Sequence, residues 1–181
     1  MIGISSSKEL EKIIRKYLIT QSELNSKNVL NALDTYGQNL NKNINSSIFD
    51  SYSTSDTVIL FELFTRDSSS DISYTNGVDG QISYYKGYEL KLYIYGEKSS
   101  DVSNKIVARF RTQYIREHLL DDGVYLEKIE EPTKLNEFIN NVMWIRNDVS
   151  ILINCKFEIP QINLDYDFEI LNDLKIIKEE N

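Results

Sequence analysis

The chain has very little cysteine and histidine, the residues that build disulfides and most zinc sites. Its 181 residues include one cysteine, Cys155, and one histidine, His118. A lone cysteine cannot close an internal disulfide, and one cysteine with one histidine falls short of a four-ligand zinc site. We therefore expect a reducing compartment, no metal and no cofactor.

Basic residues are scarce relative to acidic ones. The chain carries 20 Lys and Arg against 28 Asp and Glu, a formal net charge of -8 at pH 7. Stable binding to nucleic acid depends on Lys and Arg at the phosphates, so this charge argues against that function. No apolar run approaches the roughly 20 residues that span a bilayer, and residues 1–16 hold no apolar segment of secretory length. We expect a soluble protein with no membrane contact and no cleaved export signal.

The length and apolar content fit one domain. With 41% hydrophobic residues, the chain is long enough to bury about two thirds of the surface that its unfolded form exposes. Neither an internal repeat nor a clear boundary divides it. We predict one domain over residues 1–181: an N-terminal helix and polar connection in 1–55, a sheet-and-helix core in 56–159, and a C-terminal tail or edge strand in 160–181.

The first third of the chain predicts a helix, a connection and a buried strand. Ser6 with Glu9 is the pattern of a capping box, and apolar residues then recur at helical spacing. Residues 24–40 indicate a short helix more weakly, and residues 39–55 are polar and rich in turn formers. Residues 57–65 (TVILFELFT) are apolar almost throughout, which predicts a central strand covered on both faces.

A hairpin and an alternating strand are expected next. Residues 66–80 are dense in Ser, Asp, Asn and Gly, and the pair Asn76-Gly77 is a strong turn signal. Residues 81–95 alternate between an apolar face and a wetter face. The apolar face holds Tyr88, Leu90, Leu92 and Ile94, and the wetter face holds Glu89, Lys91, Tyr93 and Tyr95.

A long helix is predicted over residues 100–120, with Ser99 or Ser100 as its N-cap and Gly123 after its end. One broad apolar stripe contains Val102, Ile106, Val107, Phe110 and Tyr114. A second patch, on roughly the opposite side, contains Ala108, Ile115 and Leu119. Either loops or the first helix cover this second patch, or a neighbouring subunit does.

The C-terminal third predicts two strands. Residues 124–130 form a short strand, and residues 135–142, after Pro132, form a brief helical or irregular piece. Residues 147–160 (NDVSILINCKFEIP) alternate most cleanly of all. The tail adds an edge strand or reaches to another chain. The whole pattern predicts an α+β fold, with a mixed or mainly antiparallel sheet flanked by an N-terminal helix and a long central helix.

Residues 95–101 (YGEKSSD) carry Gly, Lys and Ser in the order of a phosphate cradle. A Walker cradle needs a second Gly so that its backbone N–H groups can surround the phosphate, and this segment has only Gly96. Glu97 would also place a negative charge beside the anion. We therefore interpret the segment as a tight turn that leads into a helix.

The remaining candidates for chemistry have simpler structural explanations. We identify no catalytic residue, because no Ser or Cys lies in the sequence context of a nucleophile elbow and the only imidazole, His118, lies on the flank of a predicted helix. Cys155 falls on an apolar strand face, and the acidic positions in residues 67–79 miss the spacing of an EF-hand loop. Trp144 and Arg146 are residue types enriched at binding hot spots, although a lone Trp is more often part of a core.

The order of the elements resembles tailed-bacteriophage neck and tail-terminator proteins. The matching positions are Tyr95-Gly96, the helix that begins near Ser100, and Arg146-Asn147-Asp148 before a late strand. The resemblance covers residues 57–157, with the first helix in register. It implies a non-enzymatic ring subunit, commonly in six copies, that caps the tail tube, joins it to the head-connector proteins and leaves a channel for DNA. It also implies a place in the virion at the head-to-tail junction, and in the host cytoplasm during assembly.

Two features of the sequence agree with a ring. A subunit of a closed ring needs a different contact patch for each neighbour, and we predict that Ala108, Ile115, Leu119, Trp144 and Arg146 contribute to such contacts. Acidic groups around a bore would repel DNA in transit and prevent it from sticking. Three alternatives stay open: a dodecameric head-completion or connector protein, a small cytoplasmic nucleotide-binding enzyme using the turn from Gly96 to Ser100, and an acidic binding module.

Overall fold

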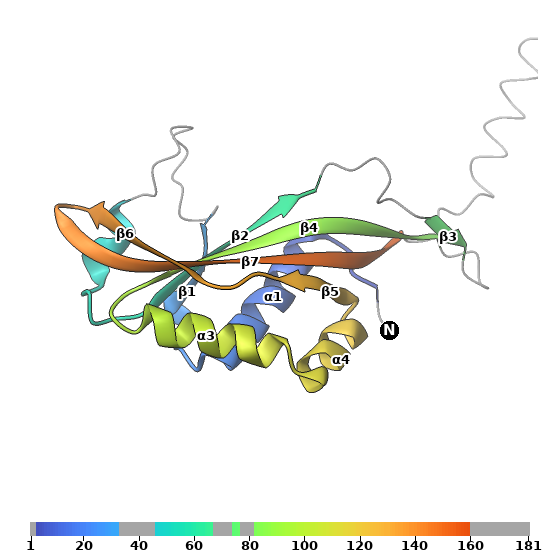
Figure 1. Ribbon diagram of the computed structural model, residues 1–181. Coiled ribbons are helices and arrows are strands. Elements are labelled where there is room, and N and C mark those ends of the chain that lie inside the picture. The colour runs from blue at the N-terminus through green and yellow to red at the C-terminus, as the bar shows by residue number, and fades with distance from the viewer. Residues whose placement is uncertain (1–2, 33–45, 67–73, 77–81, 160–181) are drawn as a thin grey trace, which may run out of the picture.

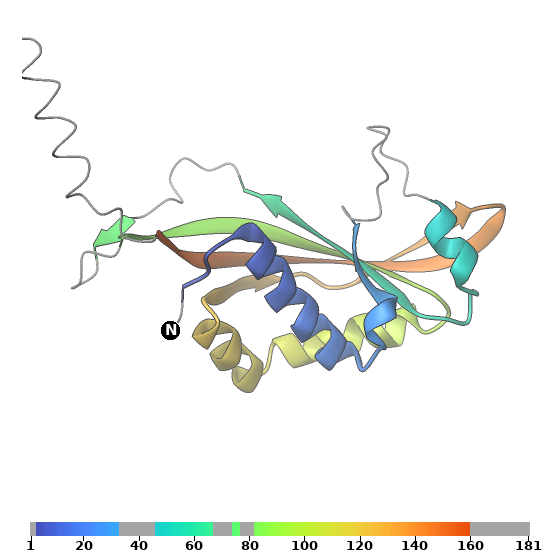
Figure 2. The ribbon, with the colours of Figure 1, turned by 180° about the vertical axis from the view of Figure 1, so that it is seen from behind.

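The computed structural model describes residues 3–32, 46–66, 74–76 and 82–159. In this part of the chain, seven strands form one sheet with the order β1-β2-β4-β7-β5, with β3 paired to β4 and β6 paired to β7. Helices α1, α3 and α4 lie together on one side of the sheet (Figure 1). The view from behind shows α1 crossing beneath the strands next to α3 (Figure 2). The expected α+β class is confirmed.

Long antiparallel strands form the centre of the sheet. Strand β4 (Ile82–Tyr95) pairs with β2 (Val58–Thr65) on one side and with β7 (Val142–Ile159) on the other, both antiparallel. The edge strand β1 (Val29–Asn31) runs parallel to β2, so the sheet is mixed as predicted. The short strand β3 (Tyr74–Asn76) extends the ladder at the far end of β4.

Alternation along the strands divides the apolar residues between two cores. The larger core lies under the helices and contains the inward residues of β4 and β7 together with the buried faces of α1, α3 and α4. A smaller core on the opposite face contains Val58, Leu60, Tyr95 and Trp144. The 3-10 helix η2 (Ser46–Ser51) covers this smaller core with Phe49.

The prediction of a strand with two covered faces holds for only half of β2. Residues 58–61 are buried, whereas Phe64 and Thr65 are exposed. On β4 the apolar face is confirmed, because Tyr88, Leu90, Leu92 and Ile94 are all buried. Tyr95 lies on the opposite face as predicted, but that face is wet only in part, and the expectation that Tyr95 is exposed to water was wrong. Tyr95 is fully buried because η2, distant in sequence, packs over the end of the strand.

The N-terminal helix α1 (Ser7–Ser22) has Ser6 as its N-cap, as expected, since the Ser6 side chain accepts from the Glu9 N–H at 3.3 Å. The reciprocal half of the capping box differs. The Glu9 carboxylate accepts from the N–H and the hydroxyl of Ser5, at 2.7 and 2.6 Å. These bonds lower the pKa of Glu9 and fix the chain before the helix. At the other end, Glu23 pairs with Lys105 and Arg109, which ties α1 to α3.

The prediction of one long helix was wrong. Two helices, α3 (Ser99–Phe110) and α4 (Gln113–Asp121), meet at a break where Thr112 has extended backbone dihedrals and acts as the N-cap of α4. Its hydroxyl accepts from the Ile115 N–H at 3.4 Å. The N-cap of α3 is Lys98, not a serine. The break changes which residues face the sheet, so Tyr114 is 66% exposed while Ile115 and Leu119 are buried.

The irregular piece expected over residues 135–142 is a strand. Strand β5 (Val124–Ile129) is confirmed, and β6 (Thr133–Ile139) then forms a hairpin with the start of β7. The hairpin turn consists of Asn140 and Asn141, both with left-handed backbone at φ 50 and 62. Two consecutive residues of this conformation give the tight turn that matches the twist of paired strands.

The segment from residue 24 forms the 3-10 turn η1 (Ser26–Asn28) and β1 in place of the short helix expected there. The remainder of that expectation, over residues 33–40, lies outside the described residues. The structure also does not describe most of the hairpin tip predicted over 66–80, with its acidic positions in 67–73 and 77–79, or the C-terminal tail.

Candidate interaction surface

The turn between β4 and α3 is closed against the protein itself. Gly96 has φ 111, and a Cβ at this position would lie 2.0 Å from the carbonyl oxygen of Asp56. The N–H groups of Gly96, Glu97 and Ser99 donate to protein carbonyl oxygens at 2.9, 2.9 and 3.0 Å. A phosphate cradle needs such groups free. The interpretation of this segment as a tight turn is therefore supported, and the turn gives no support to a nucleotide site.

The hydroxyl groups of the same turn are also occupied. The Asn147 amide on β7 donates to the hydroxyls of Ser99 and Ser100, at 2.8 and 3.2 Å. Ser99 and Asn147 are buried, at 0% and 3% exposure. The register of β4 and β7 also places Tyr95 opposite Arg146. The two short segments that carry the family resemblance thus lie side by side and hold each other in place.

Arg146 lies at the centre of a charged network on the outer face of the sheet. Its Nε and Nη2 donate to the two carboxylate oxygens of Asp148 at 2.7 and 2.8 Å, and its Nη1 donates to Glu137 at 2.6 Å. The Tyr95 hydroxyl donates to the same Glu137 carboxylate at 2.9 Å. The guanidinium stands 5.3 Å from the ring centroid of Tyr93.

This environment determines the protonation of both central groups. Burial and the neighbouring Glu137 carboxylate raise the pKa of Tyr95, so its hydroxyl stays a donor. Burial disfavours the charged guanidinium of Arg146, but the bonds to Asp148 outweigh it and raise the pKa of Arg146. The spacing Arg-x-Asp on a strand explains the pair, because alternate residues point to the same face. Arg146 is therefore a fixed cation that joins three strands, β4, β6 and β7.

Next to Arg146, the outer face has an open hollow of about 440 Å³. Its lining is mainly charged and polar, and it includes Glu89, Lys91, Glu130, Glu131 and Asp148. Many of these groups are already paired within the chain. For example, the Ser150 hydroxyl donates to Glu89 at 2.8 Å, and the Lys91 ammonium lies 5.0 Å from the ring centroid of Phe64. The hollow is open and mainly polar, and it lacks the apolar, enclosed character of small-molecule sites.

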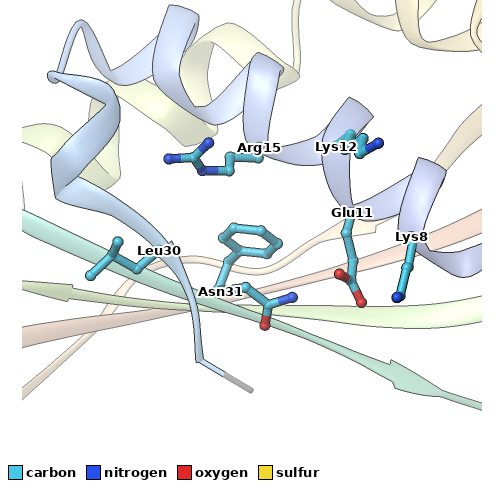
Figure 3. A pocket seen from close by; sticks show the side chains of 7 residues that line it. Lys8, Glu11, Lys12, Arg15, Leu30 and Asn31 are labelled. Carbon is cyan, nitrogen blue, oxygen red and sulfur yellow. The ribbon is translucent and has the colours of Figure 1, made fainter. Parts of the chain in front are cut away.

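A second hollow, of about 370 Å³, lies between α1 and β1 (Figure 3). Lys8, Lys12 and Arg15 give it a cationic rim, with Glu11 as the one acid among its lining residues. Arg15 is committed to structure, since its Nε donates to the Val29 carbonyl at 2.9 Å and its Nη2 to the Ser26 carbonyl at 2.7 Å. The two lysines remain as a local basic patch on an acidic chain.

The five residues predicted for a subunit interface lie in different environments. Ile115 and Leu119 belong to the chain's own core, at 6% and 0% exposure. The helix break turns them toward the sheet, so their burial does not need a neighbouring subunit. Ala108 is exposed. Trp144 is 2% exposed and contacts the Phe49 ring edge-on at 4.9 Å between centroids. Arg146 is half-buried in its network, so its charge is largely satisfied within the chain.

The most exposed apolar surface is one that the sequence analysis missed. On the β6–β7 hairpin, Leu135, Phe138, Val142 and Met143 are 41%, 70%, 45% and 53% exposed. Phe138 and Met143 are paired across the hairpin. Figure 1 shows that this hairpin projects at one end of the sheet, beyond the helices. The pair Asn140-Asn141 between apolar residues was the available signal, since Asn favours the left-handed turn positions of short hairpins.

The other candidates for chemistry have structural roles. Burial raises the pKa of the Cys155 thiol to about 12, which makes it unreactive at neutral pH. His118 is exposed, with its Nδ1 2.8 Å from the Tyr114 carbonyl oxygen. Asp122 accepts from the Tyr17 hydroxyl at 3.0 Å. Among the described residues, no cluster of three or more His, Cys, Asp or Glu could hold a metal ion. None of the helices there is long and apolar enough to cross a membrane.

The fold is that of an α+β protein with an exposed apolar hairpin and an open polar hollow on its outer face. Residues 8–174 match the family described as phage neck terminator protein, and the chain belongs to this family. The match confirms the family predicted from the element order. It gives the chain a structural role at the phage head-to-tail junction, as a neck component of the virion that interacts with other virion proteins. No curated protein matches the chain.

Proposed function

We propose that copies of this chain close into a ring that caps the tail tube, joins it to the head-connector proteins and leaves a channel for DNA. Six copies are the expected number. The observation that carries the proposal is the exposed apolar surface of the β6–β7 hairpin, where Phe138 is 70% and Met143 is 53% exposed. Exposed apolar groups of this size, gathered on one projecting element, are typical of surfaces that another protein covers.

The charge of the chain supports a conducting role over a DNA-binding one. The formal net charge is -8, and the cations of the outer face, such as Arg146 and Lys91, are paired with carboxylates. A ring built from such subunits repels a passing DNA backbone on average. We therefore expect no retention of duplex DNA by the assembled protein in a gel-shift assay at about 0.1 M salt, where charges still act over roughly 10 Å.

Mass measurement of the purified protein tests the proposal. Native mass spectrometry and negative-stain microscopy at micromolar concentration should give a closed ring of six copies. A ring of twelve would favour the alternative of a head-completion or connector protein. A monomer at every concentration tested, in a protein that also fails to bind purified tails, would refute the ring and its place on the tube.

A further inference from the structure

We infer that the hairpin of one copy docks into an apolar groove between α4 and β5 of the next copy. This inference rests on the proposed ring. On the hairpin, Leu135 and Val142 lie on one face and Phe138 and Met143 on the other, and the docking surface is the face with Phe138 and Met143. Together with Tyr114 on α4 and Tyr125 on β5, these residues are six of the seven large apolar side chains exposed in the described part of the chain. The exposed apolar surface thus falls into two groups.

The two groups lie toward opposite ends of the molecule. Figure 1 and Figure 2 agree in placing the β6–β7 hairpin at one end of the sheet and α4 toward the other. A closed ring of identical subunits uses two different patches, one for each neighbour, whereas a two-fold dimer uses one patch twice. Two separate patches on one chain are what a head-to-tail contact requires.

The second patch includes a concave site of suitable size. A groove of about 200 Å³ lies between α4 and β5, lined by Arg116, Glu117, Leu120, Val124, Tyr125 and Leu126. Its floor is apolar and its rim is charged. The hairpin supplies a projecting aromatic side chain, Phe138, and a flexible thioether, Met143, which adapts to irregular apolar surfaces. A convex apolar element and a concave apolar site on the same chain are complementary in shape and polarity.

One charged group at each patch has the opposite sign to one at the other. At the hairpin turn, the Asn140 amide donates to the Asp50 carboxylate at 2.7 Å, which places a negative group at the tip of the hairpin. The groove is lined by one cation, Arg116, and one anion, Glu117, whose carboxylate accepts from the Gln113 amide at 2.7 Å. The Arg116 guanidinium has no carboxylate partner in the part of the chain that the structure describes. Docking brings Asp50 of one copy toward Arg116 of the next.

Cysteine cross-linking between two variants tests this contact. Phe138→Cys and Tyr125→Cys are made separately, and the native Cys155 is kept because it is fully buried. Under mild oxidation, each variant alone should stay uncross-linked, while an equal mixture should give a disulfide dimer. The double variant should give a ladder that ends at the copy number of the ring. Phe64→Cys mixed with Tyr125→Cys is the control, since Phe64 is exposed at neither patch, and it should not cross-link.

Two further variants measure the same contact without a disulfide. Phe138→Ser should weaken association by roughly 10- to 100-fold per contact, because it removes one buried aromatic side chain. Asp50→Arg and Arg116→Asp should each weaken assembly, and their combination should restore it. If the protein forms a ring while Phe138→Cys cross-links with itself or not at all, the docking inference fails and the ring stands. If the wild-type protein never assembles, both the docking inference and the proposed function fail.

Discussion

Replacing Arg146 by Met should destabilise the protein, and the structure gives the size of the effect. Methionine keeps the length of the stem and removes the charge and all the donors. Three charged hydrogen bonds are lost, two to Asp148 and one to Glu137. The two carboxylates and the Tyr95 hydroxyl then remain close together without the cation that held them.

The magnitude follows from the burial of the network. Hydrogen bonds to charged groups contribute about 1.5–3 kcal/mol each when buried, whereas exposed ion pairs contribute about 0–1 kcal/mol. The side chains here are 18%, 28% and 33% exposed, which lies between the two cases. We therefore expect a loss of about 2–3 kcal/mol in the free energy of unfolding. For a chain of this size, that corresponds to a fall in Tm of roughly 4–12 °C.

Urea unfolding followed by circular dichroism measures the loss, with a double-mutant cycle between Arg146→Met and Asp148→Asn to isolate the pair. Arg111→Met is the matched control. Its partner is Glu131 at 2.7 Å, but these side chains are 45% and 75% exposed, so the change should be at most about 0.5 kcal/mol. Equal effects of the two Arg substitutions would refute the view that Arg146 is a structural cation.

Three further substitutions test other parts of the fold. Gly96→Ala should cost at least about 2 kcal/mol in urea unfolding, since it combines left-handed strain with a clash against the Asp56 carbonyl; a cost near zero would contradict the geometry of the turn. Thr112→Ala should cost about 1 kcal/mol by thermal unfolding through loss of the N-cap of α4, while Thr112→Ser should retain most of the stability. Burial raises the pKa of the Cys155 thiol in the folded state to about 12, from an ordinary value of 9.0. The unfolded chain therefore loses this proton at lower pH than the folded protein does. The contribution of the thiol to the free energy of unfolding is complete below pH 9 and declines as the pH rises above it. Between pH 9 and 10.5, the free energy of unfolding of Cys155→Ala should therefore fall by roughly 1.5 kcal/mol less than that of the wild type. Equal falls would exclude the buried thiol as a cause of the pH dependence.

The strands were predictable where one face is buried and the other is not. Residues 147–160 alternate because the helices cover one face of β7 and the other stays partly wet. Strand β6 escaped prediction for the opposite physical reason. Most of its residues are exposed on both faces, so Leu135, Phe138 and Ile139 follow no period of two. Its structure comes from the Asn140-Asn141 turn and from pairing with β7, and these are not properties of its own composition.

The helix break and the second core could not be found from local pattern. A continuous helical period through residues 100–120 hides a change of direction at Thr112, because the residues around it are polar and fit either arrangement. Trp144 and Arg146 were expected just before a strand, and the structure places both within β7, which begins at Val142. Their burial depends on Phe49, far away in sequence, and on Glu137 of the unpredicted strand. Such contacts between distant segments leave no local signature.

The dimensions of the elements explain why this fold leaves surface for other proteins. Strand β7 has 18 residues and extends roughly 60 Å, at about 3.3 Å per residue. Helix α1 has 16 residues and extends roughly 24 Å, while α3 and α4 together supply 12 and 9 residues, roughly 31 Å. A helical layer of this length cannot cover the full strand, so one end of β7 projects with β6 past the helices. That end carries Phe138 and Met143, which no α-helix of the described residues covers. The exposed apolar surface of the hairpin is therefore a consequence of the length of β7. Shortening the β6–β7 hairpin should remove assembly while leaving the larger core intact.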